Sequence, residues 1–176
     1  MKKKQILLIT GLIFWLALGG LIFSQQSDGE KGILKARMAK AALQLDTPKE
    51  AIINEPFEVK VLMDSGRNQV NAVGVYLSFD PSKLQLLQLD SQASFCQFYP
   101  EKKFDNQLGR VNLACGSPHP GVAGENHLLL LSFLPVSLGE TSIRVRPESK
   151  ILRSDGKGMD ILRDYPQADL MIVNGL

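Results

Sequence analysis

The sequence predicts an all-β domain, an antiparallel jelly-roll β-sandwich of about nine strands, preceded by one N-terminal transmembrane helix. Short apolar runs separated by Gly, Pro, Asn and Asp clusters fill the chain after residue 41, which is typical of strands and turns. No amphipathic helical pattern of ten or more residues follows Leu45. An uncharged, largely apolar run near the N-terminus predicts the helix.

That run begins after Lys2, Lys3 and Lys4, and its apolar centre spans residues 6–23, which is 18 residues. A helix of this length just crosses about 30 Å of hydrocarbon. The preceding lysines favour a cytoplasmic N-terminus and an extracytoplasmic domain. A cleaved signal peptide is the alternative, but its apolar core is usually about 7–15 residues. We expect residues 1–23 to be a single-pass membrane anchor or a signal sequence, and either one exports the domain.

Residues 24–40 are polar and end in several basic side chains, so they predict a spacer between the membrane and the domain. A solvated tether and a segment lying at lipid headgroups are the two interpretations. The remaining residues, 41–176, hold 13 basic and 16 acidic side chains, a net charge of −3. This acidic balance argues against nucleic acid as a partner.

The clearest strand pattern lies between Val70 and Leu87. Val73, Val75, Leu77 and Phe79 alternate with polar or small residues, which predicts a strand with one buried face. Asp80 and Pro81 then end the strand, because proline lacks an N–H group. Tyr76 and Ser78 should point away from the core, and they are our candidate binding residues; ordinary solvent-facing positions are the alternative. The candidate strands are Ala42–Leu45, Phe57–Met63, Ala72–Phe79, Leu84–Leu89, Ser94–Phe98, Arg110–Ala114, His127–Pro135, Ser142–Arg146, Lys150–Leu152 and Leu170–Val173.

The chain has two cysteines, Cys96 and Cys115, and an even count in an exported protein favours a disulfide. The polar segment between them predicts the tip of a long hairpin. Two buried free thiols are the alternative. The aromatic residues near Cys96 could form a surface patch, but we expect them to pack beneath the hairpin: Phe95, Phe98, Tyr99 and Phe104.

Four segments resemble, in order, the cohesin and related carbohydrate-binding-module superfamily. They are the strand entry at residues 55–59, the strand and Asp-Pro corner at 70–89, the strand and turn at 126–141, and the Asp-Gly loop at 154–162. The resemblance covers residues 41–174 and implies a sandwich of about nine strands that binds a partner at a cell surface. Cohesins carry polar dockerin contacts where this chain has Ala72 and Gly74. The resemblance therefore implies a protein partner more firmly than a dockerin.

Other polar residues give weaker indications. Asp155, Asp160 and Asp164 lie near two glycines, so a calcium loop is conceivable, but their spacing fits no EF-hand and a plain turn with Gly156 and Gly158 at unusual φ is favoured. No cofactor or metal site is expected.

Catalysis is not expected either. The histidines, His119 and His127, lie in no nucleophile motif, and Glu125 and Glu140 form no recognisable pair. We expect a non-enzymatic module that attaches to a protein partner. A carbohydrate-binding module and a structural component of an envelope assembly are the alternatives.

Overall fold

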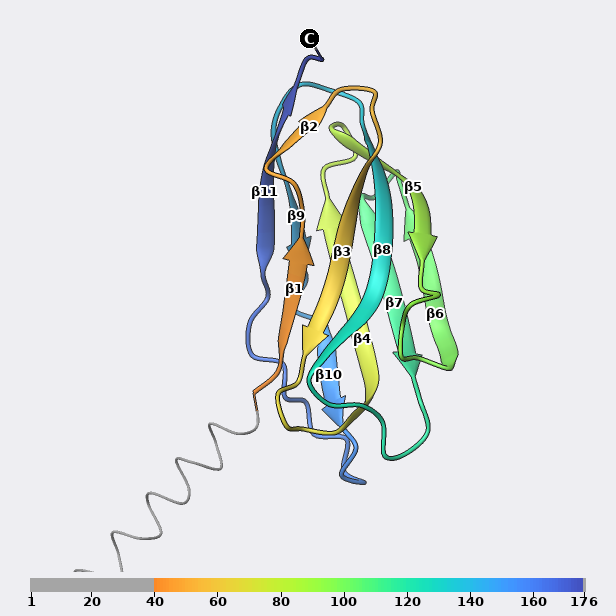
Figure 1. The fold of residues 1–176 in the computed structure, drawn as a ribbon. Helices are drawn as coiled ribbons and strands as arrows, with labels where there is room; N and C mark the ends of the chain where they lie inside the picture. The colour runs from red at the N-terminus through yellow and green to blue at the C-terminus, as the bar shows by residue number, and fades with distance from the viewer. Residues whose placement is uncertain (1–39, 176) are drawn as a thin grey trace, which may run out of the picture. The chain divides into compact units, whose positions relative to one another are not determined.

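The computed structural model describes residues 40–175, and within them every regular element is a β-strand (Figure 1). The anchor or signal sequence expected over residues 1–23 and the spacer expected over 24–40 fall almost wholly outside this range. Among residues 40–175 there is no helix of a length and apolarity suited to crossing a membrane.

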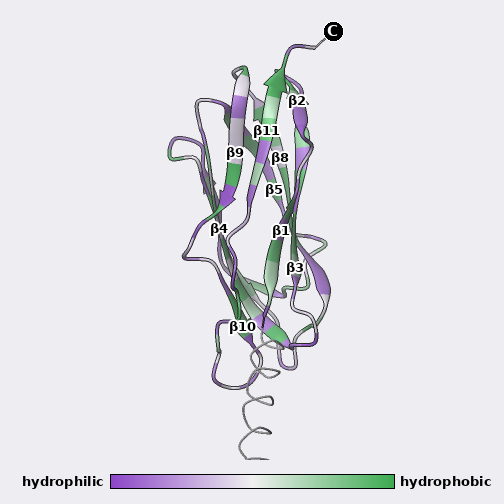
Figure 2. Cartoon of the chain, turned by 90° about the vertical axis from the view of Figure 1, so that its left-hand side faces the viewer, coloured by the Kyte–Doolittle hydropathy of each residue, from purple (hydrophilic) through white to green (hydrophobic). Residues whose placement is uncertain are grey.

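Two stacked sheets form the domain. The smaller has the order β1-β3-β8-β5, from strands Ala42–Asp46, Phe57–Asp64, Glu125–Pro135 and Leu84–Asp90. The larger has the order β2-β11-β9-β4-β7-β6, with β10 also paired to β4; its strands are Glu50–Ile52, Gln167–Val173, Gly139–Val145, Val70–Phe79, Arg110–Gly116, Phe98–Asp105 and Lys150–Arg153. Figure 2 shows the layers edge on, with β9 and β4 to one side and β1 and β3 to the other.

The core lies between the sheets and is filled by the inward-facing side chains of their strands. On β4 the side chains of Val73, Val75 and Leu77 are at most 3% exposed. Phe133 of β8 is fully buried, stacks on Phe57 with ring centroids 5.9 Å apart, and meets the Phe79 ring edge-on at 5.1 Å. Burying such aromatic rings removes much apolar surface from water, so this cluster stabilises the contact between the sheets.

The predicted sandwich is confirmed, with eleven strands instead of about nine. Strand β2 was missed because it has three residues between two proline-containing turns. It pairs in parallel with β11, so the sandwich is not wholly antiparallel. The chain thereby passes from the edge of the smaller sheet in β1 to the edge of the larger sheet in β2.

The strand expected at Ser94–Phe98 is wrong. Residues 94–97 are bends and irregular backbone, and β6 begins at Phe98 and runs to Asp105. Strand β6 is the edge of its sheet and mostly exposed, so its sequence FYPEKKFD carries no alternating apolar pattern. It does form the long hairpin with β7 that the sequence predicted.

The turn of this hairpin also reaches the other sheet. Asn106 Oδ1 accepts a hydrogen bond from the backbone N–H of Leu86 at 2.8 Å, and Asn106 Nδ2 donates to the Leu86 carbonyl oxygen at 3.0 Å. Strand β5 is an edge of the smaller sheet, so one amide side chain supplies the partner that a neighbouring strand would supply.

Candidate functional site

We call the solvent-facing side of β4 and β7, in the larger sheet, the outer face. Its β4 residues are each paired in register with a residue of β7. Tyr76 and Ser78 lie on it, as predicted, because Val75, Leu77 and Phe79 point into the core. Their role in binding stays a prediction. The full set is Ala72, Gly74, Tyr76, Ser78, Arg110, Asn112, Ala114 and Gly116.

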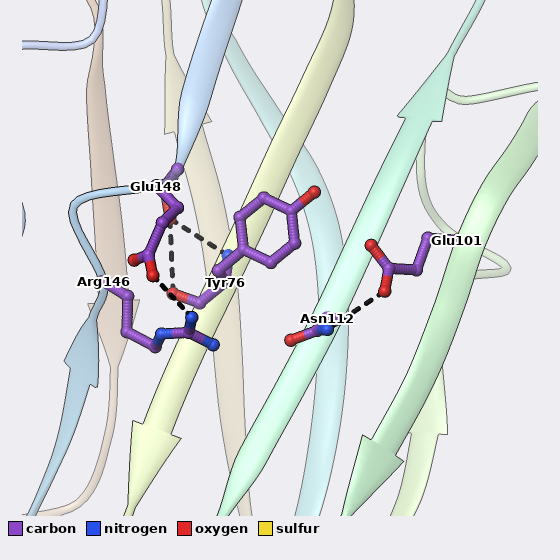
Figure 3. Close-up of polar contacts among 6 residues, drawn as sticks. Tyr76, Glu101, Asn112, Arg146 and Glu148 are labelled. Atoms are coloured by element: carbon purple, nitrogen blue, oxygen red, sulfur yellow. Dashed lines mark hydrogen bonds and ion pairs between the residues drawn. The ribbon is translucent and has the colours of Figure 1, made fainter.

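Tyr76 is held at the point where β4 changes its neighbour from β9 to β10 (Figure 3). The fully buried Ser149 hydroxyl accepts from the Tyr76 N–H at 3.0 Å and donates to the Tyr76 carbonyl at 3.2 Å. The Arg146 N–H donates to the same carbonyl at 2.8 Å. The Tyr76 ring lies beside Gly74, where an added Cβ would be 3.2 Å from ring atom Cε2. A glycine at position 74 therefore leaves room for this ring against the sheet.

Charged side chains surround the ring. The Arg146 guanidinium lies 6.0 Å from the Tyr76 ring centroid and pairs with Glu148 at 2.6 Å. Asn112 Nδ2 donates to Glu101 Oε1 at 3.0 Å, and Lys103 Nζ lies 2.9 Å from the same oxygen. These groups form one polar border on each side of Tyr76; Figure 3 shows Arg146 and Glu148 on one side and Asn112 and Glu101 on the other.

The electrostatics follow from these contacts. Burial raises the pKa of the Tyr76 hydroxyl, and the Glu101 carboxylate raises it further. Hydrogen bonds from Lys103 and Asn112 lower the pKa of Glu101. The hydrogen bond from Arg146 lowers the pKa of Glu148. At neutral pH the border therefore carries ionised pairs beside a neutral phenol.

A groove of about 730 Å³ opens next to Tyr76. Its floor is made of small residues in register, Ala72 with Gly116 and Gly74 with Ala114. Phe98 forms one wall, 52% exposed, and its ring lies over Gly116, where an added Cβ would come within 2.5 Å of ring atom Cζ. The opposite wall carries Lys150 and Leu152 of β10.

The disulfide between Cys96 and Cys115 is confirmed, and no free cysteine remains. It fixes the segment before Phe98 to β7, where the Gln97 N–H donates to the Gly116 carbonyl at 2.8 Å. The Tyr99 hydroxyl lies 3.1 Å from the Ser91 carbonyl and 3.2 Å from the Cys96 carbonyl, with geometry for donation to either. These bonds position Phe98 as the groove wall.

The expectation that the aromatic residues near Cys96 pack beneath the hairpin is therefore wrong for two of them. Phe98 is 52% exposed and Phe104 is 41% exposed. The reason is that β6 is an edge strand, and its aromatic side chains have the outer face or solvent beside them instead of the core.

The remaining candidates lie apart from the outer face. The carboxylates of Asp155 and Asp160 accept backbone N–H bonds within their turns, and Gly156 and Gly158 have positive φ, as predicted. Across residues 40–175, no three acidic, histidine or cysteine side chains come together as a metal site would need. Glu125 and Glu140 belong to different sheets. His119 Nδ1 lies 2.9 Å from the Ser154 hydroxyl at an exposed turn.

Sequence reasoning missed the residues that position Tyr76. Ser149 and Arg146 belong to a short connection between β9 and β10, whose Pro-Glu-Ser sequence marks only a turn. Phe98 was noticed for its type and assigned the wrong environment. Gly116 carried a usable signal, because a glycine that continues the alternation of a strand often marks a close approach of another group.

No protein-family model and no curated protein matches the sequence. The fold, however, is shared with solved cohesin modules. The cohesin module of a family 33 glycoside hydrolase from Clostridium perfringens superposes with a TM-score of 0.64 at 12% identity, over 77% of this chain and 98% of that one.

A cohesin from Clostridium acetobutylicum gives a TM-score of 0.60 at 14% identity, over 76% of this chain and 90% of that one. A type I cohesin from Clostridium thermocellum, solved in a complex with a dockerin, gives 0.61 at 9% identity, over 76% and 95%. The chain thus has a cohesin-like fold, which confirms that part of the sequence resemblance.

Proposed function

We propose that this protein is a non-catalytic binding module, tethered on the extracytoplasmic side of a membrane, that attaches to a protein partner through its outer face. The observation that carries the proposal is the groove beside Tyr76, since an apolar concavity bordered by charged pairs suits the anchor residue of a protein partner. Two cohesins with this fold were solved in complexes with dockerins, which supports a protein as the partner. The sequence of residues 1–23 supports the location.

Site-specific photocrosslinking in the protein's own cells tests this proposal. A benzophenone amino acid is placed at Lys150, on the groove wall, and in a second strain at Lys60, on the opposite sheet. We expect a protein adduct from position 150 and none from position 60. The additional change Ala72→Arg, which fills the groove floor, should abolish the adduct. Equal adducts from both positions, or an adduct that survives Ala72→Arg, would contradict the proposal.

A carbohydrate-binding module is the second candidate, because Tyr76 and Phe98 both line the groove and exposed rings stack on sugars. A glycan array with the fragment 40–176 discriminates the two. Clear binding to one glycan class that is lost in Tyr76→Ala would favour carbohydrate over protein.

A further inference from the structure

A row of three hydrogen-bond donors crosses the end of the outer face and continues onto β9. Ser78 of β4 is paired in register with Arg110 of β7 on one side and with Arg144 of β9 on the other. Neighbouring strands are about 4.8 Å apart, so the two arginines start about 10 Å from each other with the serine hydroxyl between them. Both arginines are exposed. We call these three residues the arginine row.

Neither arginine of the row makes a close ion pair. The Glu148 carboxylate, which pairs with Arg146, interacts with Arg110 at longer range, and both side chains line the groove. The ion pairs found among residues 40–175 are Lys103–Glu101, Arg146–Glu148 and Arg153–Asp155. Arg144 Nε donates instead to the Ser142 hydroxyl at 3.1 Å.

The carboxylates beside the row make no close ion pair with it. Asp105 lies across from Arg110, but its Oδ1 accepts the backbone N–H groups of Gln107 and Leu108 at 2.7 and 3.0 Å. Asp169 shares a depression with Arg144 and accepts from the Gln167 side chain. Glu140 and Asp80 border that same depression without an ion pair to Arg144. The row therefore presents two guanidinium groups without a close carboxylate partner, although residues 41–176 carry a net charge of −3.

The row adjoins the groove, because Arg110 also lines it together with Tyr76. From Gly74 on the groove floor to Ser78 is four residues of strand, or about 13 Å. A guanidinium group binds a carboxylate through two parallel hydrogen bonds, and a buried apolar anchor supplies most of the affinity of a small interface. The groove and the arginine row together therefore favour a partner surface that carries an apolar side chain and a carboxylate about this far apart.

We propose that the occupant of the outer face is an acidic protein segment that places an aliphatic or aromatic side chain in the groove and a carboxylate on the arginine row. This inference rests on the proposed function, and it adds the charge and spacing of the partner. A carboxylate over Ser78 would accept from the hydroxyl and from both guanidinium groups.

Selection from a phage-displayed library of random peptides tests it, with peptides of roughly 15 residues so that a helix spans the distance. The target is the oxidised fragment 40–176, which contains the whole core. Binders are first filtered for loss of binding to Ala72→Arg, which limits them to the outer face. We expect these binders to be enriched in Asp and Glu over Lys and Arg, next to a large apolar residue.

Charge reversal gives the second measurement. The double variant Arg110→Glu, Arg144→Glu should weaken the selected peptides by about tenfold or more, because it removes the charged contacts and repels the carboxylate. The matched control is Lys60→Glu, Lys157→Glu, which changes the net charge equally at two exposed residues away from the outer face. The control should alter binding by less than about twofold at 0.15 M salt, where exposed charges are screened.

The outcomes separate the two proposals. Peptides that are lost in Ala72→Arg but bind Arg110→Glu, Arg144→Glu normally would overturn the acidic partner and leave the binding face standing. Equal weakening in the charge-reversed variant and in its control would also overturn it, since only overall charge would matter. Peptides indifferent to Ala72→Arg, or no binders at all, would count against the binding face itself. Displacement of the peptides by polygalacturonate at micromolar concentration would indicate an acidic glycan instead.

Discussion

Gly116→Ala should destabilise the domain and push the Phe98 ring out of the groove. The added Cβ would lie 2.5 Å from Phe98 Cζ and 2.9 Å from the carbonyl oxygen of Asn71. Both distances are shorter than a carbon atom tolerates. The ring is 52% exposed and can rotate away, whereas the Asn71 carbonyl is fixed by the hydrogen bond it accepts from the Ser117 N–H at 2.9 Å. The contact of the added Cβ with the Phe98 ring can therefore relax, whereas its contact with the Asn71 carbonyl oxygen cannot.

Overpacking of this kind costs about 1–3 kcal/mol in the free energy of unfolding. In the double variant Gly116→Ala, Phe98→Ala, we expect the loss in the free energy of unfolding to be about 1 kcal/mol smaller than the sum of the two single losses. The reason is that the clash between the added Cβ and the Phe98 ring no longer exists. Urea unfolding of the oxidised fragment 40–176, followed by circular dichroism, gives all four stabilities. Circular dichroism suits the fragment because its sequence contains no tryptophan.

Gly74→Ala is the matched control on the neighbouring strand. Its Cβ would meet only the Tyr76 ring, at 3.2 Å, with a backbone atom no nearer than 3.9 Å. A small tilt of the ring relieves that contact, so the loss should stay below about 1 kcal/mol. Two results would refute the idea that these glycines leave room for aromatic rings packed on the sheet. One is additive losses of stability for Gly116→Ala and Phe98→Ala, and the other is a larger loss of stability for Gly74→Ala than for Gly116→Ala.

Three further changes test the framework around the site. Asn106→Ala removes two part-buried hydrogen bonds, of 2.8 and 3.0 Å, from the edge of β5 and should cost about 2 kcal/mol in urea unfolding, with faster amide exchange along β5; unchanged exchange would contradict this role. Ser149→Ala leaves the Tyr76 N–H without its partner and should cost about 1–3 kcal/mol, whereas Ser149→Cys, which keeps a weak donor and acceptor, should cost less. Replacing Cys96 and Cys115 together by serine opens a loop with a sequence separation of 19 and should lower stability by about 3 kcal/mol; an equally stable variant that still binds the selected peptides would show that the bridge does not hold the groove wall.

The strands in which apolar and polar residues alternate could be predicted from the sequence. The strands β3 and β4 bury one face each, so their apolar residues recur mainly at every second position and predict both strand and orientation. Strands β2 and β6 lack that signal for different reasons. The first is too short to show a period, and the second lies at an edge where neither face needs apolar residues.

The candidate site was predictable only in part, because its geometry depends on pairings across the sheet. The outward direction of Tyr76 follows from its own strand. The residues that hold its backbone, Ser149 and Arg146, could not be found in this way. Ser149 is 73 residues from Tyr76 in the sequence and contacts it only because β10 replaces β9 as the neighbour of β4 at this point. The arginine row is likewise a matter of register, which no local pattern around Arg110 or Arg144 reveals.

The hydrogen bonds that Asn106 makes to Leu86 bear on how such domains behave when many are crowded on one surface. An open strand edge is a template for another chain, and a row of copies could polymerise through it. Here the edge of β5 meets an amide that saturates one backbone N–H and one carbonyl, while the edge of β6 carries Pro100, Lys102 and Lys103, which disfavour strand addition. At these two edges, contacts between neighbouring copies through strand addition are thereby disfavoured.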